Sequence, residues 1–262
     1  MAVLSLAALW LGGCGVLFNA NFDSDPVEER PLERPPGPPG SDRVFVPAVE
    51  SAEGYDTPPV VFHDDTNVGN VVHYSNRRLD PAVKWMGFFG RRSNASSDAY
   101  WYTWNGQLHG QSPLELQFVV GDITDAFWTI TVLRITDGLK GATLELLTDA
   151  EPRTFETIGS VRRGGDEHAM VLRFDKETRQ YALTVFPGVP PESDVRPATI
   201  RSGMRPSLLH PTVDLRSAPN LILLFPERGI FSMYFIDDVR ITETCPRQVA
   251  AGDGTMLRYD CL

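Results

Sequence analysis

The stretch AMVLRFDKETRQYALTVF, residues 169–186, is typical of a β-hairpin. Two runs rich in branched and aromatic side chains, 169–174 and 181–186, flank the polar segment 175–180, which has the composition of a turn. The chain then continues with the letters PGVPP, and proline and glycine at this density do not start a helix. We therefore expect a hairpin followed by a loop.

Short runs of the same kind recur along the chain, and glycine, proline, asparagine and aspartate stand between them. No window of helical length shows an apolar period of about 3.6 residues. This pattern predicts an all-β fold, a jelly-roll-like antiparallel β-sandwich. Besides the hairpin, the expected strands are 17–22, 43–46, 60–62, 70–74, 83–89, 99–104, 114–120, 127–135, 143–147, 155–161, 221–225 and 230–242.

Composition and motifs limit the classes of function that the sequence supports. The 262 residues suffice for one large β domain, and 24 Lys and Arg against 34 Asp and Glu give a net charge of -10. An acidic chain argues against nucleic acid as a partner, because binding to phosphates needs a basic surface. The sequence has no Gly-x-Ser-x-Gly or His-Glu-x-x-His motif, and no pair of carboxylates can be selected for glycoside hydrolysis. A binding or structural role is therefore favoured over an enzymatic one.

The N-terminal segment resembles a bacterial lipoprotein signal. Residues 1–10 are almost entirely apolar, and LGGC at 11–14 resembles the lipobox. The resemblance implies export, removal of residues 1–13, and lipid anchoring of Cys14 in the bilayer of the cell envelope, with Gly15 favouring the outer membrane. The apolar run is too short to span a bilayer, which needs about 20 residues. The alternative is a buried N-terminal strand with an incidental cysteine.

These features divide the chain into three expected parts. They are a signal peptide at 1–13, a lipid-anchored β-sandwich at 14–244 with a Pro-rich loop or linker at 28–41, and a C-terminal tail at 245–262. If the lipid occupies Cys14, only Cys245 and Cys261 are left to pair in an oxidising compartment, which would close the tail. Two unpaired buried thiols are the alternative.

Three short stretches resemble carbohydrate-binding-module and lectin-like jelly rolls. They are Asn21-Phe22-Asp23 after the first strand, the turn of the hairpin, and YFIDDVRI at 234–241. The resemblance covers about 18–242 and implies a last strand paired beside the first. It also implies binding of carbohydrate or of an envelope polymer. The alternatives are a glycan-acting hydrolase or lyase on the same scaffold, and an architectural lipoprotein that docks onto a protein partner.

An aromatic strand supplies the candidate ligand-binding residues. Tyr100, Tyr102 and Trp104 point to one side of this strand, and Trp101 points to the other. If the first side packs on the core, Trp101 would show its ring outside, with Trp85 as a companion, as sugar-binding platforms do. The alternative is that both faces are covered and that Trp101 belongs to the core, because large aromatic side chains are usually buried.

The last strand carries an acidic pair, Asp237 and Asp238, among apolar residues. The apolar residues that alternate with Asp237 are Phe231, Met233, Phe235, Val239 and Ile241, and we expect this face to be buried. A buried carboxyl group must be protonated, paired, hydrogen-bonded or metal-bound. The resemblance implies a structural Ca²⁺ held by Asp237 with Asp23 and Asp25, and no other cofactor. The alternatives are a β-bulge that turns Asp237 outward and simple capping of a neighbouring loop by its side chain.

Overall fold

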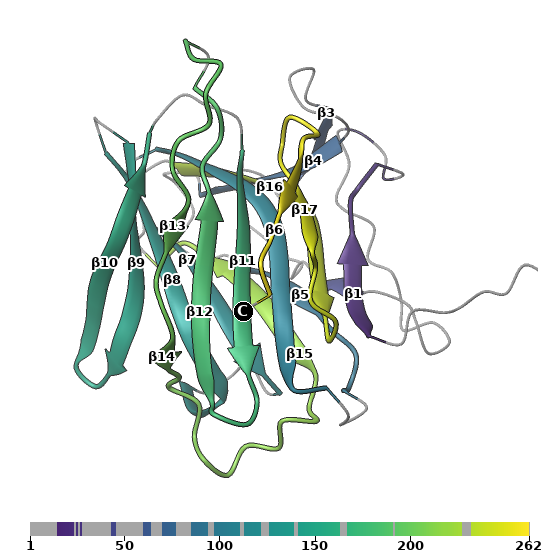
Figure 1. Cartoon of the computed structure of the whole chain (residues 1–262), viewed down its shortest axis with the longest axis vertical. Coiled ribbons are helices and arrows are strands. Elements are labelled where there is room, and N and C mark those ends of the chain that lie inside the picture. Colours follow the sequence, from purple (N-terminus) through teal and green to yellow (C-terminus); the bar gives the residue numbers. More distant parts are fainter. Residues whose placement is uncertain are drawn as a thin grey trace, which may run out of the picture.

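The computed structural model describes residues 15–23, 25, 27, 43–45, 60–63, 70–76, 85–93, 97–110, 113–121, 126–138, 141–162, 167–190, 192–226 and 232–261. In these ranges the chain forms antiparallel strands and one turn of 3-10 helix, η1 (Ala126–Trp128). Two large sheets pack face to face, which confirms the predicted β-sandwich (Figure 1). No helix within these ranges is long and apolar enough to cross a bilayer. Cys14 and the segment 28–41 lie outside the described residues.

The first sheet has nine described strands. They are β1 (Val16–Ala20), β3 (Val60–His63), β4 (Asn70–Asn76), β6 (Ala99–Gly110), β11 (His168–Asp175), β12 (Gln180–Phe186), β13 (Ile200–Arg201), β14 (Arg205–Pro206) and β16 (Ser232–Thr242). Their order is β13-β12-β11-β6-β16-β4-β3, with β14 paired to β12 and β1 paired to β16. The last long strand therefore lies beside the first, as the resemblance implied.

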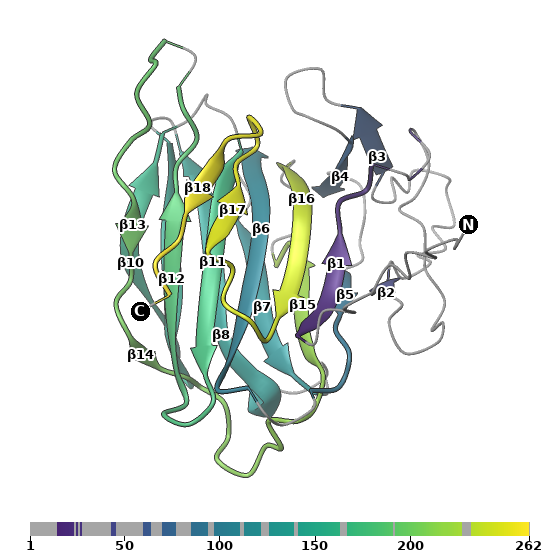
Figure 2. The same ribbon diagram turned by 45° about the vertical axis from the view of Figure 1, so that its right-hand side comes forward.

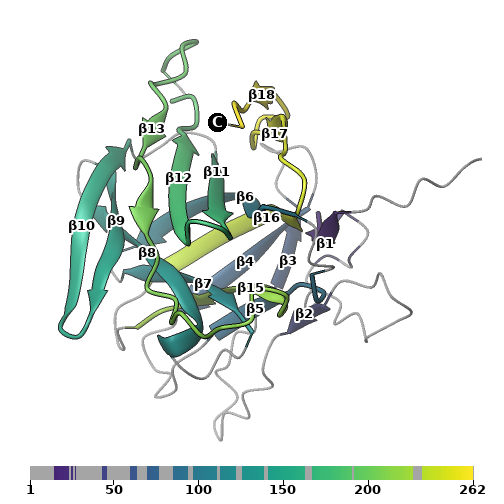
Figure 3. The ribbon, with the colours of Figure 1, turned by 60° about the horizontal axis from the view of Figure 1, so that its bottom comes forward.

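The second sheet has seven described strands in the order β10-β9-β8-β7-β15-β5-β2. They are β2 (Arg43–Phe45), β5 (Trp85–Phe89), β7 (Leu114–Val120), β8 (Thr129–Gly138), β9 (Gly141–Ala150), β10 (Arg153–Val161) and β15 (Pro219–Leu224). A separate hairpin, β17 (Gln248–Ala250) and β18 (Met256–Arg258), lies on the outer side of the first sheet (Figure 3). The architecture is thus two layers with a small third layer on one side.

The hairpin at 169–186 forms as the sequence predicts. β11 and β12 pair continuously from Ala169 opposite Phe186 to Asp175 opposite Gln180. Oδ1 of Asp175 accepts hydrogen bonds from the backbone N–H and the hydroxyl of Thr178, at 2.8 and 2.9 Å. This side chain closes the polar turn, because it satisfies donors that no strand partner reaches.

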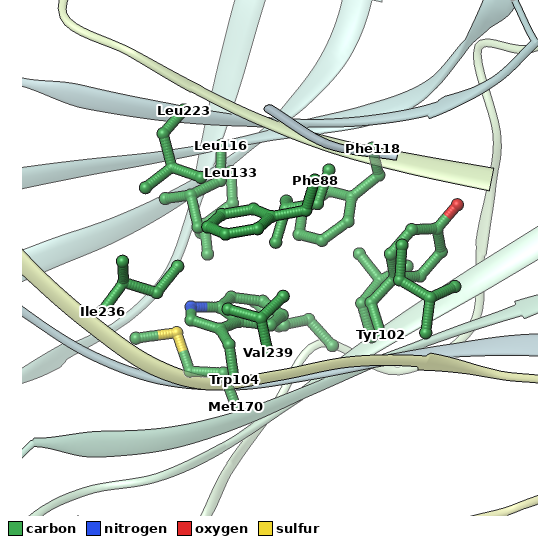
Figure 4. Close-up of a cluster of buried hydrophobic side chains, with 14 of the residues drawn as sticks. Phe88, Tyr102, Trp104, Leu116, Phe118, Leu133, Met170, Leu223, Ile236 and Val239 are labelled. Atoms are coloured by element: carbon green, nitrogen blue, oxygen red, sulfur yellow. The ribbon is translucent and has the colours of Figure 1, made fainter. Parts of the chain in front are cut away.

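The core lies between the two sheets and is rich in aromatic side chains (Figure 4). The rings of Tyr102 and Trp104 on β6 lie 5.2 and 5.4 Å from the ring of Phe118 on β7. Trp104 donates its indole N–H to the hydroxyl of Tyr234 at 3.1 Å, so both buried polar groups are satisfied. A Cβ at Gly106 would collide with that hydroxyl, which explains glycine in the middle of β6.

One expected strand begins later than predicted. Residues 127–135 were expected as strand, but Phe127 and Trp128 form η1 and β8 starts after them. Phe127 stacks on His210 with ring centroids 4.1 Å apart. Trp128 lies against Gly121, where the φ of +97° and the absence of a side chain make room for the ring. Contacts with distant residues, which no local pattern shows, hold these two aromatic side chains outside the sheet.

Candidate ligand-binding groove

A β-bulge interrupts β16 at the acidic pair. Asp237 lies opposite Asn105 of β6, whereas the next paired residue, Arg240, lies opposite Thr103. Three steps along β16 therefore match two steps along β6, and Asp238 adopts a left-handed φ of +48°. One extra residue moves every later side chain to the opposite face of the strand.

The bulge corrects the predicted burial of the last strand. The side chains of β16 that enter the core are Tyr234 and Ile236 before the bulge and Val239 and Ile241 after it. The expectation of one buried odd-numbered face is therefore right after the bulge and wrong before it, where Met233 and Phe235 are only half-buried. Phe231 lies outside the described residues.

Asp237 is buried although the bulge separates it from the core face. Its side chain is 9% exposed, and its Oδ1 has no hydrogen-bond partner. Burial raises the pKa of Asp237 to about 8, and the neighbouring charges of Asp238 and Asp23 act in the same direction. Of the states expected for a buried carboxyl group, the protonated one fits best at neutral pH. The alternative that the bulge turns Asp237 out to solvent is wrong.

The structural Ca²⁺ that the resemblance implied, with Asp237, Asp23 and Asp25 as ligands, stays a prediction. Within the described ranges, no three His, Cys, Asp or Glu side chains gather closely enough to hold a metal ion. Asp23 acts electrostatically on Asp237, but Asp25 does not complete a set of three with them.

The C-terminal tail, residues 245–261, is closed by a disulfide between Cys245 and Cys261, with Cα atoms 6.0 Å apart. The predicted pairing is thereby confirmed. The tail carries β17 and β18, and Figure 2 shows them in front of β6 and β11 with β16 and β1 beside them. The tail therefore lies over the outer face of the first sheet.

Trp101 points to this outer face, as strand alternation predicts, but the tail covers it. Trp101 packs in an apolar cluster with Val171 of β11 and with Val249 and Tyr259 of the tail, and it is only 9% exposed. The expectation of a Trp101 ring open to a sugar is therefore wrong. Trp85 is the first residue of β5, and its side chain lies outside the described residues.

A groove runs between the tail and the outer face of β1, β16 and β6. It consists of a wide cleft of about 600 Å³ and an adjoining hollow of about 100 Å³. Both are lined by Thr103, Arg240, Pro246 and Gln248, so they form one continuous site. Ligand-binding sites are commonly concave regions of several hundred Å³. We refer to these two hollows together as the groove.

Strand register places polar side chains across the floor of the groove. Asn19 of β1, Arg240 of β16 and Thr103 of β6 form one cross-strand row. Asn105 lies further along β6, and Gln248 lines the groove from the tail. Amide and hydroxyl groups both donate and accept hydrogen bonds, so this lining matches a ligand rich in hydroxyl groups.

Asp238 and Arg240 supply the charges of the groove. Arg240 Nη2 lies 3.6 Å from Asp238 Oδ1, and the two side chains are 53% and 25% exposed. Burial raises the pKa of Asp238, Arg240 opposes this shift, and the charge of Asp23 adds to it. A residue other than glycine at positive φ is uncommon, and such strain is enriched at functional sites. Because the bulge creates this conformation, it also places Asp238 in the groove.

A second polar cluster lies where β16 ends. Nζ of Lys176 donates to Glu243 Oε1 at 3.0 Å and to the hydroxyls of Ser93 and Ser97 at 3.0 and 2.7 Å. Both hydroxyls donate to Glu243 in turn, and the Lys176 ammonium lies 4.1 Å from the centre of the Tyr100 ring. Ser93 and Ser97 thus donate their hydroxyl protons to the carboxylate of Glu243, which is already paired with the Lys176 ammonium. This arrangement ties four segments together and is typical of a structural network.

Sequence reasoning did not identify the groove residues Asn19, Thr103, Arg240 and Gln248. The signal that could have pointed to them is the acidic pair at 237–238, because two charged residues in succession inside an apolar strand are compatible with a bulge. The assembly of one site from β1, β6, β16 and the tail has no local signature.

No protein-family model matches the sequence, and no curated protein matches it. Solved structures resemble this chain to different degrees. A carbohydrate esterase, vb_24B_21, from the Shiga toxin-encoding bacteriophage phi24B superposes with a TM-score of 0.51 at 11% sequence identity, over 88% of this chain and 99% of that chain. The carbohydrate recognition domain of Emp47p gives a TM-score of 0.45 at 8% identity, over 87% of this chain and 94% of that chain. At such identities a likeness concerns the fold.

Proposed function

We propose that this protein binds a neutral carbohydrate in the groove between the C-terminal tail and β16. The observation that supports this most directly is the chemistry of the lining. Amides and hydroxyls surround one pair of opposite charges, Asp238 and Arg240, so the charged side chains of the groove sum to zero. A polyhydroxylated ligand can replace the water that these groups bind without introducing an unpaired charge.

The groove would hold a sugar by hydrogen bonds rather than by stacking on an aromatic ring. Trp104 borders the smaller hollow but is only 1% exposed, and Trp101 is covered by the tail. Met256 of the tail is 56% exposed and offers apolar surface to the carbon face of a sugar ring. The likeness to a carbohydrate esterase is compatible with this proposal but is not evidence for it, because one fold hosts many functions.

The test is a glycan array followed by measurement of affinity with groove variants. Arg240→Ala and Gln248→Ala are each expected to weaken binding of the best glycan by tenfold or more, since each removes a group that lines both hollows. The matched control is Arg258→Ala in β18, an arginine that is 89% exposed and does not line the groove. The proposal fails if no glycan binds, or if Arg258→Ala weakens binding as much as Arg240→Ala.

The same array separates the rival functions. A hydrolysis or ester-cleavage assay on each bound glycan tests for a glycan-acting enzyme. If no glycan on the array binds and the protein instead binds a defined envelope protein, an architectural role replaces the proposed carbohydrate binding. Retention of the intact glycan supports a binding protein.

We further propose that the protein is exported and attached to the cell envelope through a lipid on Cys14, with the outer membrane as its site. The support is the apolar segment at 1–10 and the LGGC at 11–14. Cys14→Ser is expected to move the protein from the membrane fraction to the soluble fraction, because acyl chains anchor such proteins. Identical fractionation of the variant and the wild type as soluble protein would contradict the anchor.

A further inference from the structure

The tail is attached to the sandwich by side chains rather than by a sheet ladder. Among the described strands, β17 and β18 pair only with each other. The backbone hydrogen bond from Tyr259 N–H to Arg247 C=O also stays inside the tail. One ion pair, Arg196 Nη2 to Asp253 Oδ2 at 2.8 Å, ties the tail to the loop after β12. The tail can therefore separate from the sheet without breaking a ladder of the sandwich.

The disulfide closes this small hairpin into a loop. An isolated two-stranded hairpin is at best marginally stable, and the tail contributes few apolar side chains, chiefly Val249 and Tyr259. Cys245 and Cys261 are 16 positions apart and follow β16, so the closed loop contains no strand of either large sheet. Opening the bond would therefore leave the chain connections of the sandwich as they are.

The disulfide also lies where a reductant can reach it. Cys245 lines the wide cleft of the groove, and both cysteines are only partly buried. Two consequences of opening follow from the geometry. Gln248 and Met256, which form the tail side of the groove, would leave the site. Trp101 and its apolar neighbours on β11 and β12 would become exposed.

We propose that the Cys245–Cys261 disulfide controls the groove: a dithiol reductant opens the tail, removes one wall of the groove and uncovers Trp101. A thiolate of the reductant attacks one sulfur of the disulfide and forms a mixed disulfide, and the second thiol of the reductant then displaces the protein sulfur. Two electrons and two protons pass to the protein, which gains the thiols of Cys245 and Cys261, and the reductant leaves as a disulfide. The loss of ligand rests on the function proposed above, whereas the opening of the tail does not.

The experiment compares full-length protein in the oxidised form with protein reduced by dithiothreitol and alkylated at both cysteines. Hydroxyl-radical footprinting with mass spectrometry reports each tryptophan separately. We expect oxidation of Trp101 to rise at least fivefold in the open form. Trp104, three residues away but inside the core, is the internal control and stays protected if the sandwich is intact. The dissociation constant for the glycan selected on the array is expected to rise at least tenfold.

A Cys245→Ala/Cys261→Ala variant provides the same open state without alkylation. If this variant does not fold, the reduced and alkylated wild type still gives the test, because it is folded before the bond is opened. Continued protection of Trp101 after both thiols are alkylated would overturn the proposal. So would an unchanged glycan affinity with Trp101 exposed, because the groove would then not depend on the tail. If Trp101 becomes reactive but the oxidised protein binds no glycan, tail opening stands and the proposed function fails.

Discussion

Glu243→Gln is expected to destabilise the folded protein by about 3–5 kcal/mol, the range found when one partner of a buried ion pair is removed. Glu243 and Lys176 are paired at 3.0 Å, and their side chains are only 9% and 11% exposed. The variant leaves the Lys176 ammonium buried beside two serine hydroxyls and one aromatic ring, without the carboxylate that balances its charge.

The pH dependence of this pair has a definite sign. Burial by itself raises the pKa of Glu243, but hydrogen bonds from Ser93, Ser97 and Lys176 and the charge of Lys176 outweigh it, so the pKa lies below its usual value. A lowered pKa contributes stability above the unfolded value of about 4.3, and this contribution is lost as the pH falls through the folded value. The Glu243→Gln variant should lack this part of the acid sensitivity.

The measurement is urea unfolding of Glu243→Gln, Lys176→Met and the double variant. The double variant should be less destabilised than the sum of the single variants, because it leaves no unpaired charge. Glu192→Gln is the matched control, since Glu192 pairs with Arg162 at 3.1 Å with side chains 63% and 70% exposed. Exposed pairs contribute about 0–1 kcal/mol. Equal effects of Glu243→Gln and Glu192→Gln would contradict the structural role of the buried network.

Asp237→Asn is expected to change stability in the opposite direction from Glu243→Gln. It should stabilise the folded protein at pH 8. The pKa of Asp237 is raised to about 8, chiefly by burial, whereas an unfolded aspartate titrates near 3.9. Between these values the folded state holds a proton that the unfolded state releases, so stability falls as the pH rises. The ionisation of Asp237 should lower the free energy of unfolding by about 1.4 kcal/mol for each pH unit in this range. Asparagine does not ionise, and the variant should lack this slope.

Unfolding free energies of wild type and Asp237→Asn between pH 5 and pH 9 test this directly. The variant should already be the more stable protein at pH 5, and its advantage should grow up to about pH 8 and then level off, because the linkage acts between the unfolded and folded pKa values. Asp260→Asn, at an aspartate that is 53% exposed, is the matched control and should change little. A variant that is less stable than wild type at pH 8, together with a wild type whose melting temperature falls in EDTA, would instead establish a bound calcium ion.

Local sequence was a good guide wherever a structure depends on neighbouring residues. The hairpin at 169–186 forms with the predicted strands and turn, because its two apolar runs and its polar turn are contiguous. The strands β13, β14, β17 and β18 were not predicted, because their two or three residues are not runs of branched and aromatic side chains. The Cys245–Cys261 pair was predicted for another reason: the chain has three cysteines, and the resemblance to a lipobox assigns Cys14 to the anchor.

The candidate site was accessible only in part. The sequence singled out Asp237 as unusual, and the structure confirms that it is buried without a hydrogen bond to its Oδ1. The choice among its possible states needed the surrounding charges of Asp238 and Asp23. The groove residues themselves are polar and unremarkable in sequence, and only the register of β1, β16 and β6 brings Asn19, Arg240 and Thr103 into one row.

By itself the sequence determined the all-β class and the direction in which Trp101 points, and the resemblance to lectin-like jelly rolls implied that the last long strand lies beside the first. Only the tertiary structure decided whether Trp101 is exposed on that face or covered. Alternation along a strand separates two faces, but it does not say which distant segment of the chain packs on each. The tail covers Trp101 from more than a hundred residues further along the chain. The single extra residue at Asp238 likewise reverses the alternation of β16, since side-chain direction has a period of two and one insertion shifts it by half a period.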